Sequence, residues 1–401
     1  MLARRALELL ATQPETEARI EREVTLLTAL GVALGAMHGM AAPEVGAVHA
    51  RAYELWKRVG ARPGLFSVAG ALWSYHNVAG RLDVALKLGD ELLEMAEVTG
   101  ARALQVTANT FLGITLHHLS QHNEARLKFT RAWDLCSMDL RPLFSGLPID
   151  PGVGAGAEVT RVLWVLGYPD QAVARLHEVL LLAEQIGHPE SLAFATLFGS
   201  FIHQLLNEPA KALEYGERVL ALSRERDVAT TLSWGSSVHG WALGATGQLE
   251  EGIAELRESL AGQRAAGAEV ARPQFDWMLG DLLVRAGRFA EAGEAAEDGL
   301  CTAARTGDHY WDSELRRLEG DLVLHTGGSP ADAEQHFREA IAHAASRGAK
   351  SLELRAATAL ARLWTSQGRD DDARRVLLPT YEWFTEAFAT ADLIVARDLL
   401  G

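Results

Sequence analysis

Three histidines, His117, His118 and His122, lie within a few positions of one another and raise the question of a bound metal ion. A protein metal site needs three or four ligands that converge on one point with a set spacing. Consecutive residues of a helix, however, point about 100° apart around its axis. We therefore expect no metal site here, and we expect the histidines to lie together at one end of a helix.

Three further groups match catalytic or cofactor-binding patterns only in part. Segment 152–156, Gly-Val-Gly-Ala-Gly, resembles a dinucleotide fingerprint, but no strand precedes it and the third glycine is at the wrong offset. Ser236 and Ser237 lie near His239, but no acid is placed to orient the base. The aspartates at 370–372 suit the N-terminus of a helix electrostatically. The sequence therefore predicts a protein that is not an enzyme and has no metal or cofactor.

The charge and cysteine content exclude several classes of partner. The chain has 401 residues, with 53 acidic and 38 basic side chains and a formal net charge of -15. An acidic surface repels phosphate groups, so we expect it to bind neither nucleic acid nor an anionic membrane. Cys136 and Cys301 are too few for a disulfide framework, and no stretch approaches the roughly 18 apolar residues of a membrane span. These features predict a cytoplasmic protein.

Turn-forming residues recur at a fixed spacing and define the elements that must position any site. The members of the first series are 40 or 41 residues apart, except across one break between Ser120 and Gly167. They are Gly80, Ser120, Gly167, Asn207, Gly247, Gly287, Gly327 and Gly368. A second series with the same spacing is Gly187, Asp227, Gly267, Gly307 and Gly348. Two registers with one period predict a repeated structural unit.

Each unit is predicted to be a pair of antiparallel helices. Ile253, Leu256 and Leu260, for example, fall on one face of a helix between two turns. Seven positions before most turns of the first series stands a small residue, where we expect the second helix to approach closely: Gly113, Ser200, Gly240, Gly280, Gly320 and Ala361. About nine pairs are predicted, at 23–60, 63–100, 102–138, 152–187, 189–227, 229–267, 271–307, 310–348 and 350–387. The predicted fold is therefore all-α, a right-handed α-solenoid of stacked helix pairs with a period of about 40 residues.

The break in the period lies at residues 138–152, where a link containing three prolines adds several residues. No linker or shift in composition divides the rest, so we expect one continuous solenoid over 1–401. Its parts are the N-terminal units 1–137, the irregular link 138–152, the C-terminal units 153–389 and a capping helix at 390–401.

The repeat pattern resembles that of tetratricopeptide proteins, lengthened from the usual 34 residues. The phrases SLELRAATALARLW and WFTEAFATADL make the resemblance more specific. They are similar to the C-terminal tetratricopeptide region of large bacterial signalling proteins, where it follows an adenylate cyclase domain and an AAA-type signal-transduction ATPase domain of the STAND-like kind. The phosphate-binding motif G-x-x-x-x-G-K-[ST] of such ATPases is absent from this sequence. The resemblance therefore implies either a fragment of such an architecture or a stand-alone relative of its sensor region.

In tetratricopeptide superhelices the first helix of each pair lines the concave face. Counting from the small residue, the predicted groove positions are aromatic in the middle units and charged toward the C-terminus, namely Phe194, Phe201, Gln204, Trp234, Trp241, Trp277, Asp281, Glu314, Arg317, Asp321, Arg355 and Arg362. Tryptophan and arginine are the side chains that most often anchor interfaces. We therefore predict that the groove binds a ligand, although single tryptophans could instead pack between units as core.

These features favour a non-enzymatic scaffold or sensor that binds a protein or peptide partner on its concave face in bacterial signalling. An alternative is a domain that senses a small-molecule effector in an aromatic pocket around Trp234, Trp241 and Trp277. A third hypothesis is an enzyme recruited onto a repeat scaffold, because a fold alone does not exclude catalysis.

Overall fold

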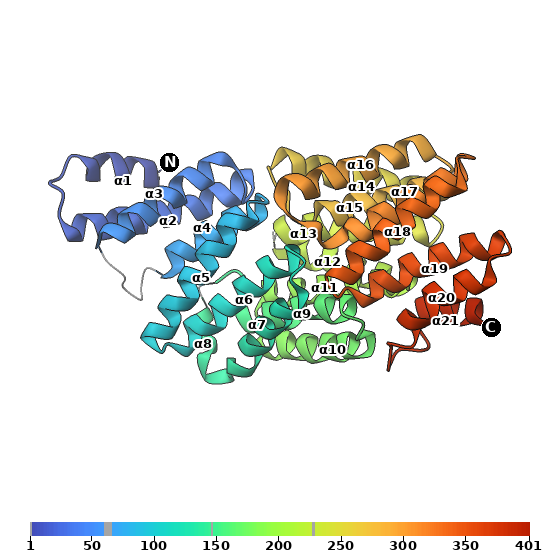
Figure 1. The fold of residues 1–401 in the computed structure, drawn as a ribbon. Helices are drawn as coiled ribbons and strands as arrows, with labels where there is room; N and C mark the ends of the chain where they lie inside the picture. Colours follow the sequence, from blue (N-terminus) through green and yellow to red (C-terminus); the bar gives the residue numbers. More distant parts are fainter. Residues whose placement is uncertain (1, 60–65, 146, 227–228) are drawn as a thin grey trace.

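The computed structural model describes residues 2–59, 66–145, 147–226 and 229–401, and within these ranges it contains helices and no strand (Figure 1). The helices that precede the link are α1 (Leu2–Ala11), α2 (Glu17–His38), α3 (Pro43–Val59), α4 (Phe66–Val78), α5 (Leu82–Thr99), α6 (Arg102–His118) and α7 (His122–Leu135). The link holds the 3-10 turn η2 (Met138–Leu140) and the short α8 (Arg141–Phe144).

The helices that follow the link alternate between first and second members of a pair. They are α9 (Pro151–Val165), α10 (Pro169–Ile186), α11 (Pro189–Leu205), α12 (Pro209–Arg226), α13 (Ala229–Ala245), α14 (Leu249–Ala265), α15 (Arg272–Arg285), α16 (Phe289–Thr306), η3 (His309–Trp311), α17 (Asp312–His325), α18 (Pro330–Ser346), α19 (Lys350–Ser366), α20 (Asp370–Tyr381) and α21 (Ala391–Leu400). The predicted all-α class and the nine helix pairs are therefore confirmed, with α1 before them and α21 after them.

The predicted turn residues adopt the left-handed backbone that ends a helix. Every member of the first series has a positive φ, including the two that are not glycine, Ser120 at 61° and Asn207 at 56°. Gly187, Gly267, Gly307 and Gly348 of the second series do the same, whereas Asp227 lies outside the described residues. This conformation is strained for most side chains. The residues that recur in the sequence are therefore the ones that the backbone at each turn requires.

The small residues of the first helices lie where a neighbouring helix leaves no room for a larger side chain. A Cβ added to Gly240 would lie 3.0 Å from the carbonyl oxygen of Gly252 in the partner helix of its pair. A Cβ at Gly320 would lie 2.5 Å from the ring of Phe337, again in the partner helix. Gly280 instead faces the next unit, with Leu318 2.5 Å from the same position. The predicted close approach is thus found both within and between pairs.

Segment 152–156 opens α9 in tight packing and shows no feature of a nucleotide loop. The Asp150 carboxylate caps the helix by accepting hydrogen bonds from the backbone N–H groups of Gly152 and Val153. A Cβ at Gly152 would lie 2.4 Å from the sulfur of Cys136, which leaves no space for a phosphate. The structural interpretation of these glycines is confirmed.

Units that are about five apart along the chain contact one another, because the stacked pairs wind into a superhelix (Figure 1). The backbone N–H of Glu269 donates to the carbonyl of Val78 at 2.9 Å. At the other end, the N–H of Ala387 donates to the Asp170 carboxylate at 2.9 Å, across 217 residues. These contacts join opposing walls of the superhelix, and the first helices α9 and α19 also pack against each other across it. No described helix is long and apolar enough to cross a membrane.

Candidate binding face on the inner helices

Opposing walls of the superhelix meet along a buried line that we call the axial seam, formed by His118, Arg161, Trp164, Leu205, Asp308, Tyr310, Ser351 and Arg355. The Nδ1 atom of His118 on α6 lies 3.1 Å from the Asp308 carboxylate, with both side chains buried. Ser351 donates a hydrogen bond to the carbonyl of Trp164, and Arg355 donates one to the carbonyl of Leu205. Each of these bonds joins residues at least 150 positions apart, so the seam fixes the winding of the solenoid.

Arg161 lies at the centre of the seam and is fully buried. Its Nη2 donates to Glu158 at 2.7 Å, and its guanidinium lies 5.2 to 5.8 Å from the ring centres of Phe198, Phe201 and Tyr310. Its Nε and Nη1 find no hydrogen-bond partner among the described residues, and neither does the Tyr310 hydroxyl. Burial without a partner costs about 1–3 kcal/mol for each polar group. The seam therefore contains polar atoms that could form hydrogen bonds but have no partner among the described residues.

The histidine cluster belongs to the seam. His117 and His122 approach each other at 3.2 Å between their Nδ1 atoms, and His117 packs 4.4 Å from the Tyr310 ring. Burial lowers the pKa of His122 to about 3, with nearby Arg347 adding to the shift, and burial likewise lowers the pKa of His117 well below its usual value. Both histidines are therefore neutral at pH 7. Among the described residues, no three potential metal ligands come together in one site.

Charged side chains on four successive first helices form a second feature, the charge ladder, made of Asp281, Glu314, Arg317, Asp321, Arg355 and Asp392. Arg317 of α17 holds Glu314 through two hydrogen bonds and Asp321 through a third at 2.6 Å. Arg355 of α19 lies 3.6 Å from Glu314 and donates to Asp392 at 2.9 Å. The ladder thus alternates acidic and basic side chains within α17 and between α17, α19 and α21, and Arg355 connects it to the seam.

The ladder passes from buried to accessible positions. Glu314 is buried, whereas Arg317 and Asp321 keep 21% and 32% of their side chains exposed. Burial alone would raise the pKa of Glu314, but Arg317 and Arg355 more than offset this effect, so its pKa is lowered. Burial raises the pKa of Asp321, against the opposing effect of Arg317. The ladder thus remains ionised at its inner end and presents charge to solvent at its outer end.

The structure separates the predicted groove residues into two groups. Five are buried in this arrangement: Phe201, Gln204, Trp241, Trp277 and Glu314. They are buried because the seam closes over the inner helices of the middle units. Six are partly exposed, namely Phe194, Trp234, Asp281, Arg317, Asp321 and Arg355, and Arg362 is exposed. Contact with a ligand remains a prediction for all twelve, and in this arrangement only the second group and Arg362 are accessible.

The buried tryptophans have roles within the protein. Trp241 donates its indole N–H to Asp281 at 2.9 Å and so orients one end of the charge ladder. Trp277 packs at 5.4 Å, edge to face, against Trp311 in the core. Sequence reasoning missed Asp308, Tyr310 and Trp311, which come from the segment between the turn at Gly307 and α17. These residues carry no periodic signal, since they lie outside the paired helices.

Comparison with known proteins supports the fold. A Rap protein solved in complex with the Competence and Sporulation Factor is similar in structure, with a TM-score of 0.60 and 12% identity, over 96% of this chain and 99% of that one. The Cut9-Hcn1 assembly of the APC/C has a TM-score of 0.56 and 16% identity, over 90% of this chain and 59% of that one. No protein-family model and no curated protein matches this chain in sequence.

A third structure bears on the family resemblance. A signal-transduction ATPase with numerous domains and a tetratricopeptide repeat sensor, from Pyrococcus horikoshii, has a TM-score of 0.51 and 14% identity. The match covers 98% of this chain and 56% of that one, so this chain spans little more than half of that protein's length. These likenesses establish a tetratricopeptide-like solenoid. The link to an adenylate cyclase remains a prediction from the sequence.

Proposed function

We propose that this chain is a non-enzymatic module of bacterial signalling that binds a protein or peptide partner through its inner helices. The observation that carries the proposal is the charge ladder, because it presents partly exposed acidic and basic side chains at the repeat spacing on α15, α17, α19 and α21. An extended peptide laid across these helices would meet at least one charged position on each of them. Arginine is among the strongest interface anchors, and Arg317 and Arg355 lie at the middle of the ladder.

The neighbouring seam supports this proposal. The unpaired Arg161 nitrogens and the Tyr310 hydroxyl would gain hydrogen bonds if a ligand with carbonyl or carboxylate oxygens separated the walls. A Rap protein of similar fold has been solved with a bound factor, which shows that such a solenoid can hold a ligand. Binding and winding would then be coupled, because the seam fixes the winding that a ligand would change.

A small-molecule effector is the second candidate, and one group of side chains favours it. Trp234 is partly exposed, and its ring meets those of Phe201 and Phe275 edge to face at 6.2 and 5.9 Å. An apolar effector stacked on this ring would quench its fluorescence. Screening a library of small metabolites by this signal, with Trp234→Phe as the control variant, would identify such a ligand.

Selection from a displayed peptide library on the purified chain, followed by calorimetry on the selected peptides, tests the main proposal. We expect Arg317→Gln to weaken the selected peptides at least tenfold, which is about 1.4 kcal/mol. The matched control is Arg257→Gln on α14, which also neutralises one ion-paired arginine but lies on a second helix. Peptides that bind both variants as tightly as the unmodified chain would contradict the ladder as the binding site.

A further inference from the structure

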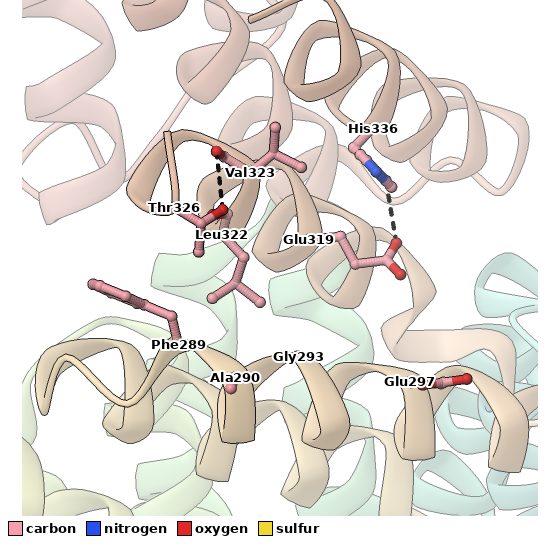
Figure 2. A pocket seen from close by; sticks show the side chains of 9 residues that line it. All are labelled: Phe289, Ala290, Gly293, Glu297, Glu319, Leu322, Val323, Thr326 and His336. Carbon is pink, nitrogen blue, oxygen red and sulfur yellow. Dashed lines mark hydrogen bonds and ion pairs between the residues drawn. The ribbon is translucent and has the colours of Figure 1, made fainter. Parts of the chain in front are cut away.

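A groove of about 500 Å³ lies between α16 and α17, on a side of the solenoid that the proposed function does not use (Figure 2). Phe289, Gly293 and Glu297 follow one another along α16, and Leu322 and Glu319 face them from α17. His336 of α18 closes one end, where its Nδ1 lies 3.2 Å from the Glu319 carboxylate. The lining is thus apolar at its centre and acidic at its rim.

Gly293, like Gly262 on α14, is a glycine inside a helix that packing against the rest of the described chain does not require. It lies in the interior of α16, where glycine is about 0.5–1 kcal/mol less favourable than alanine. Its φ is not positive, and a Cβ added there would meet no atom within 4 Å. The glycines of the first helices, by contrast, lie against packed neighbours. Gly293 therefore leaves the α16 wall of the groove without a side chain at its centre.

The charges around the groove favour a positively charged ligand. Glu297 is exposed and forms no ion pair among the described residues, and Glu294 one turn earlier is in the same state. Burial raises the pKa of Glu319, so this carboxylate would gain from a nearby positive charge. No lysine or arginine lines the groove.

A second groove, between three other helices, provides an internal comparison. It measures about 400 Å³, lies between α5, α6 and α7, and is lined by Glu97 and Glu124 together with Lys128 and Arg131. Leu127 rather than glycine stands at its wall. Its own basic side chains would repel a basic ligand, so the two grooves differ in charge although both lie between successive helix pairs.

We infer that the groove between α16 and α17 binds a basic amphipathic helix of a partner protein. Its aliphatic side chains would pack over Gly293, Phe289 and Leu322, and its lysine or arginine side chains would pair with Glu297 and Glu319. Because Gly293 has no side chain, the backbone of the bound helix could approach α16 closely at this point. This site lies apart from the charge ladder, so the module would have separate surfaces for two partners.

A synthetic helix tests this inference without knowledge of the natural partner. The probe is an amphipathic peptide of leucine and lysine, about 14 residues or roughly four turns long, labelled for fluorescence anisotropy. A peptide with glutamate in place of lysine is the charge control. We expect the lysine peptide to bind the full chain and the glutamate peptide not to bind.

Matched variants locate the binding. We expect Gly293→Leu and Glu297→Lys each to weaken the lysine peptide at least tenfold. Gly262→Leu on α14 also replaces an interior helix glycine with nothing within 4 Å, and Glu251→Lys makes the same charge change on α14. Both control variants should bind normally. Because a Cβ added at Gly293 meets no neighbour and the rest of the side chain would extend into the open groove, the melting temperature of Gly293→Leu should not fall, so lost binding would not reflect unfolding.

Three results would overturn the inference. The lysine peptide could fail to bind the unmodified chain, or it could bind all four variants equally, which would indicate attraction to the net charge of -15 alone. Sedimentation could also show that the unmodified chain is a dimer and that Gly293→Leu is a monomer. The groove would then be an interface between two copies of this chain.

Discussion

The axial seam and the charge ladder use the same kinds of side chain in opposite surroundings. Arg161 in the seam is fully buried with its carboxylate partner Glu158, whereas the pair of Arg317 and Asp321 in the ladder retains solvent contact. A buried ion pair that loses one partner leaves an uncompensated charge, but an accessible pair exchanges its partner for water. The comparison teaches that burial, rather than residue type, separates the charges that hold the superhelix from those available to a ligand.

The largest expected effect is the loss of the Glu158 carboxylate. Glu158→Gln should lower the free energy of unfolding by about 3–5 kcal/mol, because it leaves the Arg161 guanidinium buried without a countercharge. Urea denaturation followed by circular dichroism measures this change.

The double variant Glu158→Leu with Arg161→Met is the control for that experiment. It removes both charges and should recover most of the lost stability, since apolar replacements of a buried pair are often neutral. A single variant as stable as the unmodified chain would mean that the seam is hydrated and open in solution, which would end its distinction from the ladder.

The repeat could be predicted from sequence, because each turn needs a left-handed residue and each close helix contact needs a small one. Ser120 and Asn207 illustrate this, since both occupy the predicted backbone conformation without being glycine. The seam could not be predicted in the same way. The pairing of His118 with Asp308 joins residues 190 positions apart and depends on the small rotation between successive units, which no local pattern encodes.

The same reason explains the outcome for the predicted groove. Trp241 and Arg317 both follow the spacing of the first helices, and the sequence treats them alike. Winding buries Trp241 and leaves Arg317 partly accessible. Position within a unit was therefore predictable, and exposure within the superhelix was not.

Overpacking one unit should show whether a local disturbance stays in the neighbouring units or also spreads across the seam. Gly320→Leu forces a side chain into the ring of Phe337 and should lower stability by about 1–3 kcal/mol. In a simple solenoid, coupling reaches only the neighbouring units. Hydrogen exchange should therefore increase first in α15 to α20, and also in α9, which packs against α19 across the seam.

Two results decide the outcome of that experiment. Gly262→Leu, at a position with nothing within 4 Å, should leave both stability and exchange unchanged. Unchanged protection in α9 would mean that the seam does not couple distant units. Equal loss of protection along the whole chain would contradict the local picture of the repeats.

Acid should act on the seam through His122. Below pH 6.5 this histidine is protonated in the unfolded chain, but it stays neutral in the fold down to about pH 3. The unfolded state then binds more protons, so stability falls as the pH drops through this window, by about 1.4 kcal/mol for each pH unit. The groups that face His122 are Arg347, His118, His343, His117 and Tyr310.

His122→Gln should reduce the slope of stability against pH between 6.5 and 3, as followed by thermal melting in a series of buffers, while the contribution of His117 remains. The matched control is His177→Gln on α10, because that histidine is exposed. An unchanged slope in His122→Gln would show that the imidazole is hydrated in the fold and titrates as it does in the unfolded chain.

The smallest effect is expected in the ladder itself. Asp321→Asn removes a partner that lies 2.6 Å from Arg317, but both side chains are partly in water and Glu314 continues to hold the arginine through two hydrogen bonds. Accessible ion pairs contribute about 0.2–1 kcal/mol, so the free energy of unfolding should fall by less than about 1 kcal/mol. The same variant should nevertheless alter the affinity of a peptide bound to the ladder, because it frees one edge of the Arg317 guanidinium. A double-mutant cycle of Asp321→Asn with Arg317→Gln, read by both urea denaturation and peptide calorimetry, separates the two quantities. A coupling of several kcal/mol in stability would mean that Arg317 and Asp321 hold the fold together, as the seam residues do. That result would contradict the ladder as the binding surface.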